Sequence, residues 1–291
     1  MIGKVLDETY VKQLYDLFTE KHWDVKSNGV FSIFDRFCRR LAELDKDEYI
    51  TMILQLTDKY LWIPEREYEK RLHHLFYTVT KDLPAPPKKK HYGICPLLGP
   101  NDFDKIKSSS HLLYMCCGES FMDIPVFLNQ QIRVYQSPPI MLTHMKSVDH
   151  IFLIDDYIGS GETGIGAVKY LTDHGVPSEK MTILVLAAQY EGMQLILEES
   201  GVHVETEVLR RKGIEMVYPD SEWELRRNQM KLIGKKLKVK EENYYLGRGD
   251  VEGLITMNRT PNNTFPFYWY QDKNITTYAP FPRSTVKAVN Q

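Results

Sequence analysis

The sequence of 291 residues lacks the features that mark several protein classes. It has no apolar run near the roughly 20 residues that span a membrane. Its first residues, MIGKVLDETYVKQL, lack the apolar stretch of a secretory signal. Its net charge of −2 lacks the basic excess of proteins that bind nucleic acid through bulk charge. We therefore expect a cytoplasmic protein that does not contact a membrane and has no nucleic acid as a direct ligand.

Cysteine is also scarce, and its arrangement does not indicate a metal site. The four cysteines are Cys38, Cys95, Cys116 and Cys117, with no CxxC pair among them. We expect reduced and mostly buried thiols. A composition of 43% hydrophobic and 26% charged residues is ordinary for a globular protein. The length allows one large domain or two modest ones.

The first part of the chain has the periodicity of helices. Apolar residues recur at helical spacing within residues 11–18, 31–41, 49–61 and 65–79. The composition then changes to DLPAPPKKKHYG, whose prolines and lysines are typical of a connector. We therefore expect three consecutive parts, listed here with their bounds: a helical region at 1–82, a connector at 83–107 and an α/β domain at 108–291.

The α/β pattern is clearest from residue 150 onward. HIFLI at 150–154 is an unbroken apolar strand, typical of a strand buried on both faces. A helix is expected at 163–174, a second strand at 181–188, a second helix at 191–200 and a third strand at 202–209. This alternation predicts a parallel sheet with right-handed crossovers.

The remaining segments give weaker signals. Residues 94–110 read as a loop, and 132–135 as a short strand. Residues 221–238 form an amphipathic, basic helical pattern. This helix is the sole feature that favours direct nucleic-acid binding, and a surface that binds a protein partner explains it equally well. LITMN at 254–258 and FPFYWY at 265–270 are expected to be strands on either side of a PNNT turn.

Two neighbouring acids, Asp155 and Asp156, follow the strand at 150–154. Ligands of parallel sheets bind at the carboxyl ends of the strands. Successive strand side chains point to opposite faces, so one acid can face a crevice while the other supports it. A carboxylate there can accept hydrogen bonds from ribose hydroxyls or hold Mg²⁺ through water. We expect both residues to be catalytic, and we take them as candidate ligands of Mg²⁺, the candidate cofactor.

A glycine-containing loop comes next and opens the following helix. It consists of Gly159, Ser160, Gly161, Glu162 and Thr163. Its glycines allow the backbone to approach an anion closely, and free N–H groups at a helix start favour a phosphate. It is not a Walker loop, because the lysine is missing, and it lacks the third glycine of a dinucleotide fingerprint. Acids followed by a phosphate loop predict a site for a 5-phosphorylated ribose; the alternative is an acid-capped strand and a glycine turn without a ligand.

IFLIDDYIGSGET resembles the phosphoribosyl pyrophosphate motif of type I phosphoribosyltransferases. That motif is an apolar strand, two acids, two or three variable residues and then Thr/Ser-Gly-x-Thr/Ser. The resemblance implies an α/β fold with a parallel phosphoribosyltransferase-like sheet and helices on both faces, preceded here by the helical N-terminal region. It also implies that Asp155 and Asp156 contact the ribose 2′ and 3′ hydroxyls and that the loop binds the 5′-phosphate.

The span from about residue 108 to 269 resembles a divergent branch of phosphoribosyltransferase-like proteins. Members of this branch occur in bacterial conflict and antiphage loci, sometimes beside retron reverse transcriptases. The segments that carry the resemblance are DDYIGSGET, LGRGDVEGL and TPNNTFPFYW. It implies a role in bacterial antiphage defence, with protein partners in a defence complex.

The chain departs from the family pattern at two places. Gly159 stands where purine-using members often have a carboxylate that serves as an acid or base. The usual pyrophosphate loop, a short turn after the first strand of the sheet, is not evident, and its nearest candidate is residues 117–120. Candidates for contacts to a second phosphate or to a base are the following polar residues: Arg210, Arg211, Arg248 and Asn263.

Two functions from different classes fit these observations. The first is an enzyme that acts on a phosphoribosyl-containing nucleotide, by phosphoribosyl transfer or by cleavage of the N-glycosidic bond. The second is a non-catalytic module that senses a phosphoribosyl ligand, such as phosphoribosyl pyrophosphate or a nucleotide, and transmits its binding to partner proteins. Fold class does not decide between them. Retention of both acids favours the enzyme, and the missing pyrophosphate loop favours the sensor.

Overall fold

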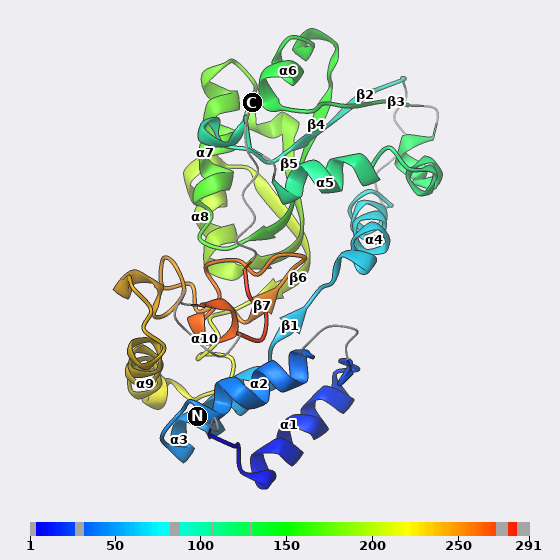
Figure 1. Cartoon of the computed structure of the whole chain (residues 1–291). Helices are drawn as coiled ribbons and strands as arrows, with labels where there is room; N and C mark the ends of the chain where they lie inside the picture. Colours follow the sequence, from blue (N-terminus) through cyan, green and yellow to red (C-terminus); the bar gives the residue numbers. More distant parts are fainter. Residues whose placement is uncertain are drawn as a thin grey trace. The chain divides into compact units, whose positions relative to one another are not determined.

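The computed structural model describes residues 4–26, 32–81, 88–105, 107–128, 130–271 and 279–283. The chain forms two compact units (Figure 1). The described parts of residues 64–210 form the first, which we call the sheet unit. The described parts of 1–63 and 211–285 form the second, which we call the flanking unit. These units do not follow the three consecutive parts expected from the sequence, because the flanking unit takes segments from both ends of the chain.

The sheet unit is built on five parallel strands, in the spatial order β3-β2-β4-β5-β6. The strands are β2 (His91–Pro96), β3 (Gln131–Val134), β4 (His150–Ile158), β5 (Met181–Gln189) and β6 (His203–Arg210). The parallel sheet confirms the predicted fold class. The order also places β2 and β4 side by side, although β3 lies between them in the sequence.

Helices cover both faces of this sheet (Figure 1). Helices α4 (Tyr68–Thr80) and α5 (Ser108–Met115) pack on one face, where the rings of Phe76 and Phe152 lie 5.3 Å apart. Helices α7 (Glu162–Asp173) and α8 (Tyr190–Ser200) pack on the other, with a short helix, α6 (Pro138–Leu142). The predicted helices at 163–174 and 191–200 are thereby confirmed.

The predicted connector is wrong over part of its length. Residues 83–107 contain β2, which pairs with both β3 and β4 in the middle of the sheet. The loop expected at 94–110 likewise begins in a strand and ends in α5. Two residues obscure the strand pattern: Gly93, where a Cβ would meet the ring of Tyr135 at 3.2 Å, and Pro96, the last residue of β2. The proline-rich part of the connector, 82–87, lies outside the described residues.

The flanking unit is mainly helical. Its elements are α1 (Glu8–Glu20), α2 (Ile33–Ala42), α3 (Asp47–Asp58), α9 (Trp223–Lys236), α10 (Pro266–Trp269) and a two-stranded parallel sheet of β1 (Leu61–Trp62) and β7 (Ile255–Thr256). Ser32 and Asp35 cap α2 reciprocally, each side chain accepting from the other's backbone N–H. Among the described helices, none has the length and apolar character that a membrane span requires.

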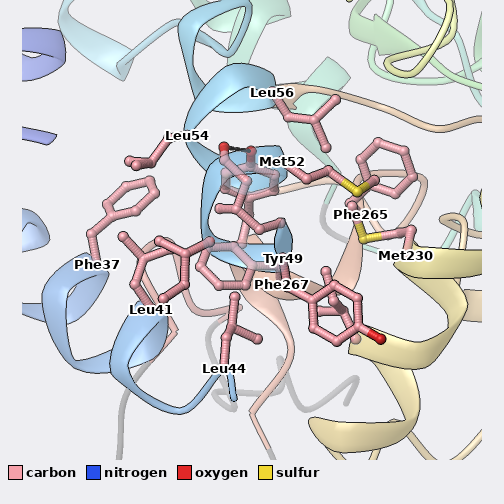
Figure 2. Close-up of a cluster of buried hydrophobic side chains, with 14 of the residues drawn as sticks. Phe37, Leu41, Leu44, Tyr49, Met52, Leu54, Leu56, Met230, Phe265 and Phe267 are labelled. Atoms are coloured by element: carbon pink, nitrogen blue, oxygen red, sulfur yellow. Dashed lines mark hydrogen bonds between the residues drawn. The ribbon is translucent and has the colours of Figure 1, made fainter. Parts of the chain in front are cut away.

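The core of the flanking unit is rich in aromatic rings (Figure 2). Phe37 of α2 lies 6.3 Å from Phe267 of α10 between ring centroids, and both side chains are fully buried. The strand predicted at 265–270 is wrong, because residues 266–269 form the helix α10. This helix starts at Pro266, and proline is a favoured first helical residue. The basic helix is confirmed as α9, and the strand at 254–258 is reduced to the two residues of β7.

Replacing Phe267 by alanine is expected to destabilise the flanking unit by about 3–5 kcal/mol, because it leaves a cavity among fully buried rings. All four tryptophans belong to this unit, so urea unfolding followed by tryptophan fluorescence measures the change directly. Leu232→Ala on the exposed side of α9 is the control, with an expected change within about 0.5 kcal/mol. Equal losses in the two variants would contradict this assignment of the core.

Candidate phosphoribosyl site

The acid pair lies within β4 near its carboxyl end. The strand continues through both acids to Ile158, beyond the end expected from the sequence, and Asp155 lies opposite Val185 of β5. Their carboxyl groups lie close together, since each interacts with the other and with the Ser108 hydroxyl of α5. Asp156 is buried on the face covered by α4, and Asp155 is half-buried. The acids are therefore held by a sheet strand and not by a loose turn.

Two hydroxyl groups from helix starts hold these acids in place. The Tyr68 hydroxyl, at the first residue of α4, donates to Oδ2 of Asp156 at 2.9 Å. The Ser108 hydroxyl, at the first residue of α5, donates to Oδ1 of Asp155 at 2.8 Å, and this oxygen also accepts from the Asp156 backbone N–H. Neither hydroxyl residue was expected from the sequence, because both lie far from the acids along the chain.

Burial makes the ionised form of this pair unfavourable. The pKa of Asp155 is raised well above its ordinary value, first because burial disfavours the anion and second because Asp156 lies beside it. The pKa of Asp156 is also raised, mainly by burial. A bound ligand that brings a cation or hydroxyl donors would stabilise the charged carboxylates. The described residues contain no group of three or more His, Cys, Asp and Glu side chains that could hold a metal ion.

The glycine loop turns directly from β4 into α7. Gly161, the residue before the helix, has φ of +86°, a left-handed conformation that glycine adopts without strain. Within the loop Ser160 is half-buried, while Glu162 and Thr163 are exposed. The backbone N–H groups of the first turn of α7 are thus at the carboxyl edge of the sheet, close in sequence to the acids.

Helix α8 fixes the shape of this loop through Gly192. A Cβ on Gly192 would lie 2.0 Å from the carbonyl oxygen of Gly159, and one on Gly161 would lie 2.6 Å from the carbonyl oxygen of Gly192. Side chains are therefore excluded from both positions. Gly192 was not expected as a site residue, although a glycine in the first turn of a helix is a signal of close backbone approach.

The strand order brings the glycine loop after β4 close to the turn that follows β2. The chain leaves β2 toward β3 on one side of the sheet and leaves β4 toward β5 on the other, so β2 and β4 flank a switch point. Ligands of open parallel sheets bind at such a point. The turn after β2, residues 97–100, lies at this edge, and a Cβ on Gly99 would be 3.9 Å from the Thr163 carbonyl oxygen. The nearest candidate for the pyrophosphate loop was wrong: residues 117–120 follow a helix, and the Ser120 hydroxyl donates to Glu69.

Three polar residues lie at or near the ends of β4, β5 and β6, on the face to which strand alternation assigns Asp155. Alternation along the paired strands puts Tyr157 of β4, Gln189 of β5 and Arg210 of β6 on that face, with Gln189 directly opposite Arg210. Gln189 is 1% exposed, and burial lowers the pKa of Arg210. The structure thus places Arg210, a predicted contact residue, on the same sheet edge as the acids, together with the unexpected Tyr157 and Gln189.

The other predicted contact residues belong to the flanking unit. Arg211 is its first residue after the sheet and is exposed. Arg248 and Asn263 join two loops of that unit: the Asn263 amide donates to the Arg248 carbonyl oxygen at 2.8 Å, and the Arg248 N–H donates to the Asn262 carbonyl oxygen at 2.9 Å. The structure gives these two residues a role in holding the loops that contain LGRGDVEGL and TPNNT.

A parallel sheet with an acid pair and a glycine loop at its switch point is the arrangement of a phosphoribosyltransferase-like protein. The family model PRTase-CE matches residues 38–283 of the chain. The chain belongs to this family, and the phosphoribosyltransferase-like class expected from the motif is confirmed.

Solved structures also resemble parts of the chain. A hypoxanthine-guanine-xanthine phosphoribosyltransferase is 16% identical, with 51% of this chain and 76% of that chain covered and a TM-score of 0.26. A protein from Aquifex aeolicus is 12% identical, with 64% and 86% covered and a TM-score of 0.33. A hypothetical protein from Neisseria gonorrhoeae with bound ppGpp is 12% identical, with 52% and 85% covered and a TM-score of 0.30. No curated protein matches the chain.

Asp155→Asn is expected to raise the thermal stability of the protein at neutral pH. The folded-state pKa of Asp155 lies well above its ordinary value of 3.8, so the parent loses stability as pH rises from the unfolded pKa to the folded one. The gain should therefore be present at about pH 7.5 and should shrink toward about pH 4, where the unfolded chain also takes up the proton. Melting followed by circular dichroism measures it, with the exposed Asp104→Asn as control. A gain that is equal at both pH values would contradict the assignment.

Gly192→Ala is expected to weaken binding of ribose 5-phosphate by at least about tenfold, because its Cβ would displace the carbonyl group of Gly159 and distort the loop. Gly166→Ala on α7 is the matched control, since a Cβ there meets nothing within 4 Å. The control should bind normally and gain about 0.5–1 kcal/mol from higher helix propensity. Isothermal titration calorimetry tests both; normal binding by Gly192→Ala would show that the loop tolerates the methyl group.

Proposed function

We propose that the sheet unit binds a phosphoribosyl group, with the ribose hydroxyls on Asp155 and Asp156 and the 5′-phosphate on residues 159–163. The observation that carries this proposal is the placement of the acid pair and the glycine loop on one strand end at the switch point of the sheet. The acids are oriented before any ligand arrives, by Tyr68 and Ser108. Such prior orientation lowers the entropy lost on binding.

Mg²⁺ is the cofactor we propose for this site. Magnesium in nucleotide sites is usually held by one or two carboxylates together with substrate phosphates and water, and not by a complete set of protein ligands. Asp155 and Asp156 supply such a pair, and burial makes their paired negative charge unfavourable without a cation. The metal would offset this charge and that of the ligand's phosphates.

The reaction we propose takes place at the anomeric carbon of a phosphoribosyl-containing nucleotide, as transfer or as cleavage of the N-glycosidic bond. Either reaction passes through a cationic, oxocarbenium-like state, which a nearby carboxylate stabilises. Asp155 or Asp156 would serve this purpose. Gln189 and Arg210, which end the neighbouring strands on the same face, are the residues we propose for contacts to the base or a second phosphate.

We also propose that this activity serves bacterial antiphage defence with protein partners. The support is the resemblance of DDYIGSGET, LGRGDVEGL and TPNNTFPFYW to the branch found in conflict loci. In that setting the reaction would deplete or modify a nucleotide. The cytoplasm, where such nucleotides occur, is the location that fits this role.

The purified protein is expected to be stabilised by a phosphoribosyl ligand. A thermal-shift screen would use phosphoribosyl pyrophosphate, ribose 5-phosphate and the nucleoside monophosphates, each with and without Mg²⁺. Ligand at about a hundredfold its dissociation constant adds roughly 2.7 kcal/mol, a shift of several degrees. The shift should disappear in the Asp155→Asn, Asp156→Asn double variant and persist in Asp104→Asn.

The same samples would then be assayed for a released base or pyrophosphate by chromatography. Release by the parent that is absent from the double variant supports an enzyme. Tight binding without any product would contradict the proposed reaction while leaving the site intact. An unchanged thermal shift in the double variant would contradict the site itself.

A further inference from the structure

The flanking unit contains an open surface cavity of about 530 Å³ that the proposed phosphoribosyl site does not use. Its first wall is α1, whose residues Gln13, Asp16, Leu17 and Glu20 recur at i, i+3, i+4 and i+7 and so share one helix face. The second wall is the last turn of α3, and residues 216–217 form the third. All three walls belong to the same compact unit. The volume lies within the range of small-molecule sites.

The lining of the cavity has an apolar part and a charged part. Its apolar lining is provided by Leu17, Leu54, Met216 and Val217, of which Leu54 is buried and the others are half-buried. Such a lining favours a ring or hydrocarbon body, because apolar area is removed from water when the ligand enters.

The charged part of the lining is predominantly acidic. Asp16, Glu20 and Asp58 contribute carboxylates, and Lys59 contributes the one lysine among the lining residues. That lysine is paired with Asp58 at 2.7 Å. Asp16 and Glu20 lie one helical turn apart, are exposed, and are not ion-paired within the described part of the chain. Two carboxylates beside an apolar lining thus remain available to a cation.

We propose that this cavity binds an organic cation with an apolar body, of the class of arylalkyl amines. The ring would lie against Leu17 and Val217, and the ammonium group would lie between Asp16 and Glu20. An anion of the same shape would meet two carboxylates of like charge, and a neutral molecule would gain no ion pair with them. The charge pattern therefore selects the cation among ligands that fit equally well.

Calorimetric titration of the full-length protein with tryptamine tests the proposal, and indole-3-propionate is the matched anionic probe. Tryptamine should bind, indole-3-propionate should not, and the affinity for tryptamine should fall with added salt. The variant Asp16→Asn with Glu20→Gln should weaken binding by roughly fivefold or more, as expected when two exposed ion pairs are lost. Val217→Thr, which keeps the side-chain shape but replaces one methyl group by a hydroxyl, should weaken binding as well.

The control for charge removes the same number of carboxylates elsewhere in the unit. Glu241→Gln with Glu242→Gln changes two exposed residues that do not line the cavity, and it should bind tryptamine as the parent does. The Asp155→Asn, Asp156→Asn variant should also bind normally, which separates this site from the proposed phosphoribosyl site. Absence of tryptamine binding, equal binding of the two probes, or normal binding by the Asp16, Glu20 variant would each overturn the proposal.

Discussion

The pair of neighbouring carboxylates near the end of β4 is the constraint on which the architecture of the site depends. Two neighbouring acids in a sheet strand are electrostatically costly, since burial and mutual repulsion both disfavour their charged forms. The sheet unit lowers this cost with donors from two helices, the hydroxyl groups of Tyr68 and Ser108. The first residues of α4 and α5 are therefore part of the candidate site. These helices cover one face of the sheet and also supply the hydroxyl groups that orient the acids.

Close backbone packing is the second requirement of the site. The loop that leaves β4 has no space for a side chain at Gly161, because α8 approaches it at Gly192. The contact between Gly164 and Ile196 continues the same packing between α7 and α8, since a Cβ on Gly164 would lie 2.5 Å from the Ile196 Cδ1. The geometry of the glycine loop thus depends on α8, a helix that follows the next strand, and rigid elements hold the loop from two sides.

The flanking unit shows how distant parts of the chain form one core. The pairing of β1 with β7 joins residues 61–62 to 255–256, and the fully buried Arg40 donates to the Tyr270 carbonyl oxygen while it pairs with Glu43. Burial lowers the pKa of Arg40, and these two partners offset part of the loss of water. The helices at the start of the chain are consequently inseparable from α9 and α10, and they do not form a domain of their own.

The sequence by itself determined the elements whose signals are local. These are the apolar strands β4 and β5, the helices that follow them, the parallel sheet and the order of acids and glycine loop, because periodicity and turn residues act within about a dozen positions. Local patterns gave wrong predictions at two places. Strand β2 was predicted as part of a connector, because Gly93 and Pro96 are typical of loops, and residues 265–270 were predicted as a strand because of their aromatic run. Only the tertiary structure decided which hydroxyls hold the acids, that Gly192 shapes the loop, and that described residues from 6–60 and 214–281 share one core. These features depend on contacts between residues far apart in the sequence. Such contacts contribute to stability only once the whole chain has folded, so local sequence patterns do not reveal them.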